Sequence, residues 1–117
     1  MRVHSIIADL PVADLAAARR FYADYLGLTV EEFNLGWVTR LTSPETGAHL
    51  QVVTRDATAT EDAVISVKVD DVDEAYAEAR RRGFEIVHPL TEEEWGVRRF
   101  FVRDPDGNVL NIVAHKD

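Results

Sequence analysis

The sequence predicts an α+β fold built from two βαβββ repeats, about residues 1–55 and 62–117, in a single domain of residues 1–117. Three observations indicate this. Short runs of alternating apolar residues are typical of strands, and two amphipathic stretches are typical of helices. The order of strand, helix and three strands also occurs twice. Since each sheet needs a helix over its apolar face, we expect helices on the outer face of a concave, curved, mixed sheet.

The first repeat is predicted to open with a strand over residues 2–10. Asp14 is placed to cap a helix, and Gly27 to end it in a left-handed conformation. The apolar side of this helix is expected to comprise Leu15, Ala18, Phe21, Tyr22 and Tyr25. Residues 29–33, 37–42 and 48–53 then form three strands, joined through turns that contain glycine.

A polar connector, residues 54–62, leads into the second repeat and its first strand, residues 64–69. Asp71 is expected to cap the second helix, with Glu74 placed for a capping box and Gly83 at the end. The buried stripe of this helix is expected to comprise Val72, Ala75, Tyr76 and Ala79. The remaining strands are predicted over residues 84–88, 98–103 and 109–115.

The two halves correspond residue by residue. Val12, Asp14, Leu15 and Ala18 stand 57 positions before Val69, Asp71, Val72 and Ala75. Leu50, Gln51, Val52 and Val53 stand 60 positions before Leu110, Asn111, Ile112 and Val113. A period of this length indicates a duplicated supersecondary unit.

Composition excludes several classes of function. A net charge of −8 argues against nucleic-acid binding, which needs a basic surface, and the run of residues 80–82 is better explained as a solvated helix face. The absence of cysteine excludes disulfides and thiolate chemistry. The sequence has no apolar stretch long enough to span a membrane and no signal-peptide pattern. We therefore expect a cytoplasmic protein that binds neither nucleic acid nor membrane.

Several short motifs occur in an order that resembles a known family. They are Val12-Ala13-Asp14-Leu15, Phe21-Tyr22, Leu26-Gly27-Leu28, Val69-Asp70-Asp71-Val72, Trp95-Gly96-Val97-Arg98-Arg99-Phe100 and Asp104-Pro105-Asp106-Gly107-Asn108. Together they resemble the vicinal oxygen chelate superfamily, which contains glyoxalases, bleomycin-resistance proteins and extradiol dioxygenases. The resemblance covers essentially the whole chain.

The resemblance implies four positions for a divalent metal ion. In the metalloenzymes of the family, His, Glu or Gln on the first and last strands of each half binds the ion. The corresponding residues here are Ile7, Gln51, Val64 and Asn111. Two aliphatic side chains and two neutral amides are a poor donor set. The resemblance therefore implies a member with no metal and no cofactor, like the drug-binding proteins of the bleomycin-resistance type.

Other residues are candidates for ligand contacts. Trp37 and Trp95 offer flat apolar surfaces for a planar ligand, or else cover a sheet edge. His49 shares a strand face with Gln51, so it is a candidate contact for the bound molecule, a replacement for a missing metal ligand or a proton carrier. The other interpretation is a hydrogen-bonded histidine at a strand end. Arg40, Arg99 and Arg103 are placed to bind an anionic group or to form cross-strand salt bridges. The acidic run of residues 92–94 is interpreted as solvated charge, and His88 as a turn or extended residue before a proline.

The favoured interpretation is a homodimeric protein that binds a partly aromatic drug or metabolite and sequesters it without catalysis. Its predicted ligand-binding residues are Trp37, His49, Gln51, Trp95 and Asn111. The alternative is a lyase, isomerase or dioxygenase-like enzyme that uses His49 or the arginines without metal, or an atypical metal site. The homodimer is expected because a chain of this size leaves sheet edges that a second copy would cover.

Overall fold

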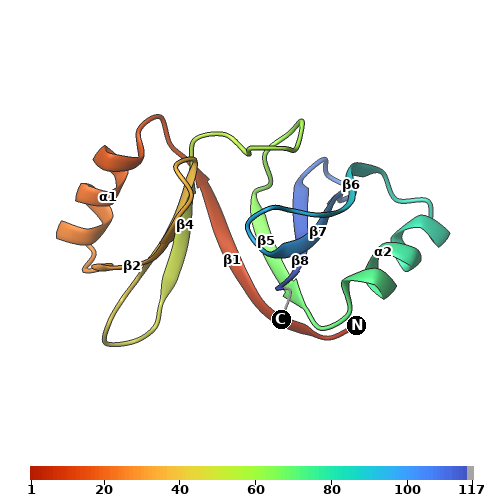
Figure 1. Cartoon of the computed structure of the whole chain (residues 1–117), viewed down its shortest axis with the longest axis horizontal. Helices are drawn as coiled ribbons and strands as arrows, with labels where there is room; N and C mark the ends of the chain where they lie inside the picture. Colours follow the sequence, from red (N-terminus) through yellow and green to blue (C-terminus); the bar gives the residue numbers. More distant parts are fainter. Residues whose placement is uncertain (116–117) are drawn as a thin grey trace. The chain divides into compact units, whose positions relative to one another are not determined.

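The computed structural model describes residues 1–115. The elements are, in order, β1 (Val3–Pro11), α1 (Leu15–Asp24), β2 (Val30–Asn34), β3 (Val38–Thr42), β4 (His49–Val53), β5 (Ile65–Val69), α2 (Val72–Arg81), β6 (Ile86–Glu92), β7 (Val97–Arg103) and β8 (Val109–His115). The succession of one strand, one helix and three strands therefore occurs twice (Figure 1). The α+β class and the two βαβββ repeats predicted from the sequence are confirmed.

The chain divides into two compact units. The α1 unit comprises residues 7–58, and the α2 unit comprises residues 1–6 together with the chain from Ala59 onward. The division between residues 58 and 59 falls within the polar connector that the sequence indicated. The first strand contributes its beginning to the α2 unit, where the backbone N–H of Arg2 donates to the Asp70 carboxylate at 2.7 Å.

The two units share one topology. In the α1 unit the strands follow the order β2-β3-β4-β1, and in the α2 unit the order is β6-β7-β8-β5. In each unit the first and last strands pair in parallel, while the other neighbours are antiparallel. Each helix packs against one face of the sheet in its own unit. The opposite face is called the helix-free face below.

The helix of the α2 unit is well buried. Its face that packs on the sheet is formed by Val72, Ala75 and Ala79, each less than one tenth exposed. Tyr76 is half-buried and its ring meets the fully buried Phe100 edge-on at 5.0 Å between centroids. The predicted buried stripe of this helix is therefore confirmed, with Tyr76 at its margin.

The helix of the α1 unit is much less buried. None of the ten residues of α1, all within the described part of the chain, is buried. Leu15, Ala18 and Tyr22 pack against the sheet as predicted. Phe21 and Tyr25, however, are 54% and 76% exposed, so their predicted place on the packed side is wrong. Their rings contact each other instead, at 5.4 Å between centroids and a tilt of 37°.

Both helices begin at the residues that the sequence indicated. The Asp14 carboxylate accepts from the first free backbone N–H groups of α1, and the Asp71 carboxylate accepts from the N–H of Glu74 at 3.0 Å. The predicted capping box is wrong in its second half, because the Glu74 carboxylate pairs with Arg81 at 3.1 Å. A glycine with positive φ follows each helix, Gly27 at +74° and Gly83 at +72°.

Most strand boundaries lie within one or two residues of the predicted ones, and the largest difference is in β6. This strand continues through Pro89 to Glu92, with irregular pairing to β7 on either side of His88. Proline lacks the N–H needed in a central strand, but β6 is the edge of its sheet. In residues 1–115 no helix is long and apolar enough to cross a membrane.

Candidate functional site

A chain of hydrogen bonds crosses the helix-free face of the α1 unit. Strand pairing places Asp9 beside Gln51, and Gln51 beside Arg40. The Gln51 amide nitrogen donates to the Asp9 carboxylate at 2.6 Å. The Gln51 amide oxygen accepts from Nε and Nη2 of Arg40, at 3.2 Å and 2.9 Å. The two ends of the Gln51 amide are thus bound to groups of opposite charge.

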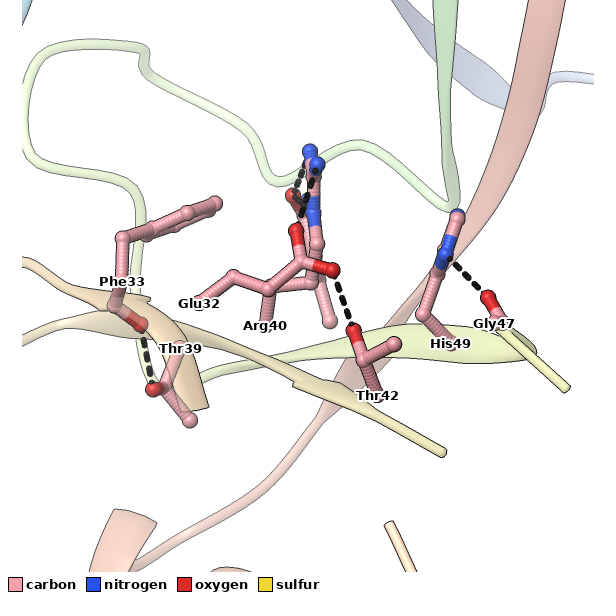
Figure 2. A network of polar contacts seen from close by, with 8 residues as sticks. Glu32, Phe33, Thr39, Arg40, Thr42, Gly47 and His49 are labelled. Atoms are coloured by element: carbon pink, nitrogen blue, oxygen red, sulfur yellow. Dashed lines mark hydrogen bonds and ion pairs between the residues drawn. The ribbon is translucent and has the colours of Figure 1, made fainter. Parts of the chain in front are cut away.

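The chain continues to Glu32 on the edge strand. Nη1 of Arg40 donates to one oxygen of Glu32 at 3.4 Å, and the Thr42 hydroxyl donates to the other at 2.7 Å (Figure 2). The Thr42 hydrogen bond, followed by the Arg40 charge, holds the pKa of the Glu32 carboxyl below its ordinary value. Glu32 is therefore ionised at neutral pH. Its side chain is 38% exposed to solvent.

Arg40 is fixed in this arrangement from several directions. Its guanidinium lies over the Phe33 ring at 5.0 Å from the centroid, while Gln51 and Glu32 bind its edges. Its side chain is 19% exposed, so it is partly reachable from solvent. A planar cation held by an aromatic ring and two acceptors loses little further freedom when it binds another group.

His49 lies at the far end of this face from Phe33 (Figure 2). It pairs with Thr42 across the strands and is exposed. Its Nδ1 is 2.9 Å from the Gly47 carbonyl oxygen, and because a carbonyl only accepts, Nδ1 carries the proton. In the neutral ring, Nε2 is then the nitrogen able to accept a proton. This geometry matches the hydrogen-bonded strand-end histidine considered from the sequence.

Trp37 stands just before β3, at the opposite end of β4 from His49. Its carbonyl oxygen accepts from the backbone N–H and the hydroxyl of Thr54, at 2.9 Å and 3.3 Å. The residue is half-buried. The structure therefore brings Gln51 and His49 onto one strand face and leaves Trp37 at the end of that sheet.

The α2 unit repeats part of this arrangement. Asn111 pairs with Ser66 as Gln51 pairs with Asp9, and its amide nitrogen is 3.0 Å from the Ser66 hydroxyl oxygen. The strand neighbour on the other side of Asn111 is Phe101, where Gln51 has Arg40. An aromatic ring supplies no N–H, and the buried amide oxygen of Asn111 has no hydrogen-bond partner in the described chain.

A buried charged cluster also lies in the α2 unit. One oxygen of Glu93 accepts from Nε of Arg99 at 2.6 Å and from Nε2 of His88 at 3.1 Å. All three residues are less than one tenth exposed. The interpretation of Glu93 as solvated charge is therefore wrong, and His88 is a buried strand residue. The fold places Glu93 directly after β6, where the antiparallel β7 brings Arg99 alongside.

Trp95 belongs to the same cluster. The Arg99 guanidinium carbon is 5.0 Å from the centroid of the Trp95 ring and 4.8 Å from that of Phe101. Trp95 is half-buried. Part of its aromatic surface is thus in contact with an arginine of its own chain, an arrangement that favours a cation over the ring face.

The residues at the four family positions do not fit a divalent ion. In the α1 unit Ile7 has no donor atom, and both ends of the Gln51 amide are hydrogen-bonded. In the α2 unit Val64 has no donor atom, and Asn111 offers one neutral amide oxygen. Within residues 1–115 no group of three or more His, Asp or Glu side chains is arranged to hold a metal ion.

A groove of about 530 Å³ lies on the other side of the α1 unit, along α1 and β2. It is lined by Arg19, Arg20, Ala23, Asp24, Leu28, Thr29, Glu31 and Leu41. Neither the predicted ligand-binding residues nor the Asp9–Gln51–Arg40–Glu32 chain contributes to it. Because the predicted ligand-binding residues and the hydrogen-bonded chain lie elsewhere, we assign the candidate site to the helix-free face.

Sequence reasoning found part of this site. Gln51, His49 and Arg40 were candidates, whereas Asp9 and Glu32 were not. A signal for Asp9 was present, since it stands two residues after Ile7 in an apolar strand and therefore on the same face. The partners of Glu32 depend on an irregularity in β2 between Glu31 and Phe33, which alternation does not reveal.

The chain was compared with family models, with curated proteins and with solved structures. Residues 2–112 match the family model of the Glyoxalase/Bleomycin resistance protein/Dioxygenase superfamily. The comparison with curated proteins finds no match. A solved structure of a superfamily member from Vibrio splendidus 12B01 is 16% identical, with a TM-score of 0.71, covering 97% of this chain and 99% of that one.

Two further solved structures share the fold. A protein described as an NAD-dependent benzaldehyde dehydrogenase from Legionella pneumophila is 21% identical, with a TM-score of 0.76, covering 96% of this chain and 100% of that one. An extradiol ring-cleaving dioxygenase from B. fuscum is 25% identical, with a TM-score of 0.69, covering all of this chain and 33% of that one. The low identities mean that these likenesses describe the fold and not the activity.

Proposed function

The chain belongs to the Glyoxalase/Bleomycin resistance protein/Dioxygenase superfamily, and we propose that it is a small-molecule-binding protein that sequesters a partly aromatic drug or metabolite without catalysis. The ligand would bind on the helix-free face of the α1 unit, where Arg40, Glu32 and His49 are partly or fully exposed. Trp37 of the same unit remains a candidate contact, and Trp95 and Asn111 remain candidate ligand-binding residues of the α2 unit, considered by itself.

One observation carries this proposal. The residue at a metal position of the family, Gln51, is held by Asp9 and Arg40 in a hydrogen-bonded chain. Such a chain offers fixed polar groups for recognition, and the neutral Gln51 amide, hydrogen-bonded at both ends, is a poor ligand for a Lewis acid. Fixed polar groups beside apolar surface are the usual make-up of a small-molecule site.

A ligand screen tests the proposal. Aromatic metabolites and antibiotics are added to the purified protein, and the midpoint of thermal unfolding is measured. A ligand that binds the folded state raises the midpoint. Gln51→Leu is expected to lower the affinity for that ligand about tenfold or more. The control is Arg98→Gln, which breaks an exposed ion pair with Asp73 on the helix-covered face of the α2 unit. A library that leaves the midpoint unchanged would contradict the proposal.

Metal analysis tests the same proposal independently. We expect the dialysed protein to hold no stoichiometric ion after Ni, Zn, Mn and Fe have been supplied in turn, because the four family positions offer no charged donor. One tightly bound ion per subunit would instead favour the enzyme.

The enzyme is the second candidate, and one observation favours it. His49 presents Nε2 as a proton acceptor on the strand next to Thr42, whose hydroxyl binds the ionised Glu32 of the edge strand. A lyase or isomerase without metal needs such a base beside a polar surface. The enzymatic function would be established if the protein turned over a ligand found in the screen. This turnover should be lost in His49→Gln and kept in Arg98→Gln.

A homodimer remains a prediction. It rests on the exposed edges of the sheets and, in addition, on the exposed aromatic residues of α1. Light scattering at micromolar concentration is expected to report twice the chain mass, and the monomer mass alone would refute it.

A further inference from the structure

Arg40 has hydrogen-bond donors left over. A guanidinium carries five N–H groups. Within residues 1–115, Nε and Nη2 each use one on Gln51, and Nη1 uses one on Glu32. Five minus three leaves two, one on each terminal nitrogen, on a side chain that is 19% exposed. These two N–H groups suit an oxygen acceptor that comes from outside the chain.

The charges around Arg40 decide what kind of oxygen this is. Glu32 is ionised and already lies 3.4 Å from Nη1 of Arg40. A ligand carboxylate on the remaining N–H groups would stand beside the Glu32 carboxylate, and like charges at that range repel. An uncharged carbonyl oxygen accepts the same hydrogen bonds without this repulsion.

We propose that Arg40 is a ligand-binding residue and that Glu32 selects the ligand, so that the site takes an aromatic compound bearing an uncharged carbonyl oxygen and rejects the matching carboxylate. This inference rests on the proposed function and adds the class of ligand. Phe33 and Gln51 hold the guanidinium in place before the ligand arrives.

Two matched pairs of probes test it: benzamide with benzoate, and 2-naphthamide with 2-naphthoate. Each pair differs in charge and keeps the ring and the carbonyl. Calorimetric titration at pH 7 is expected to show the amide binding about tenfold tighter than the carboxylate in at least one pair. Arg40→Gln is expected to lower the affinity for the amide about tenfold. Glu32→Gln keeps an acceptor for the Thr42 hydroxyl. It is expected to raise the affinity for the carboxylate about tenfold and to change the affinity for the amide little.

The control residue, Glu31, is the neighbour of Glu32 on β2 and lies on the opposite face of that strand. Arg19 and Glu31 form an ion pair of 2.6 Å on the helix-covered side, and neither contacts Arg40. Glu31→Gln should therefore leave the preference for the amide unchanged. If Arg40→Gln does not fold, Arg40→Lys replaces it, because lysine keeps the charge but lacks the planar fork; the same loss of the amide is expected.

Three results would overturn the inference. They are tighter binding of the carboxylate by the wild type, unchanged amide affinity in the Arg40 variant, and binding of none of the four probes. In each case the library screen separately decides whether the protein binds a small molecule at all. If library ligands bind whether or not they carry a carbonyl oxygen, the proposed function is supported and this inference is refuted.

Discussion

In the α1 unit the amide of Gln51 has partners at both ends, whereas in the α2 unit the amide of Asn111 has one at its nitrogen end. The two residues occupy equivalent positions in the duplicated topology, and their strand neighbours differ: Arg40 beside Gln51, Phe101 beside Asn111. One substitution on a neighbouring strand thus determines whether the same backbone position belongs to a complete polar chain. A duplicated fold fixes positions, and the side chains around them fix the chemistry.

The charged groups and the helices of the two units differ in the same sense. Glu93 and Arg99 are buried in the α2 unit, while Glu32 and Arg40 remain partly exposed in the α1 unit. Helix α2 buries three residues against its sheet, but Phe21 of α1 and Tyr25 at its C-terminal cap remain exposed to solvent. The α2 unit therefore has the features of a stabilising core, and the α1 unit those of a binding surface. Four predictions test this contrast.

The largest effect is expected from the core of the α2 unit. Phe100→Ala removes a ring that is 1% exposed and packed on Tyr76, which should lower the free energy of unfolding by about 4 kcal/mol. Phe21→Ala is the matched change in the α1 unit and should cost less than about 1 kcal/mol, because that ring is 54% exposed. Chemical denaturation measures both, and equal losses would end the contrast between the helices.

The next effect concerns the buried carboxylate. Glu93→Gln removes the charge of the carboxylate that lies 2.6 Å from Nε of the buried Arg99, and we expect a loss of about 3 kcal/mol in the free energy of unfolding. Glu32→Gln, at a side chain 38% exposed, should cost less than about 1 kcal/mol. Urea unfolding of both variants gives the comparison. Similar costs would mean that solvent screens the two ion pairs alike.

The two amides should respond differently to an isosteric apolar residue. Gln51→Leu removes the partner of Asp9 and of Arg40 together and should cost about 2 kcal/mol in unfolding free energy. Asn111→Leu removes a buried oxygen that lacks a donor and one hydrogen bond from the amide nitrogen to Ser66, so we expect a smaller loss of about 1 kcal/mol. A loss in Asn111→Leu as large as that in Gln51→Leu would contradict the difference between the two amides.

The smallest effect is on pH dependence. Because the folded-state pKa of Glu32 is lowered, its contribution is present above its ordinary value of 4.5 and is lost as the pH falls through the folded value. The difference in unfolding free energy between wild type and Glu32→Gln should therefore shrink between pH 7 and pH 3. A difference that stays constant over this range would mean that ionised Glu32 gains nothing from Arg40 and Thr42.

The sequence by itself determined the element order, the duplication and both helix starts, because these depend on local signals. Asp14 and Asp71 accept hydrogen bonds from residues two to three positions away, so their roles are visible in the sequence. The family positions Ile7, Gln51, Val64 and Asn111 also followed from motifs and offsets along the chain.

The tertiary structure alone decided which polar side chains meet. Glu93 and Arg99 come together through a hairpin, and Asp9 meets Gln51 from a strand 42 residues away. It also decided that Phe21 and Tyr25 remain exposed, although their helical spacing matched the packed side. Helical periodicity gives the direction of a side chain relative to its own helix axis, and only the packing of the helix on the sheet sets how much of that side is covered.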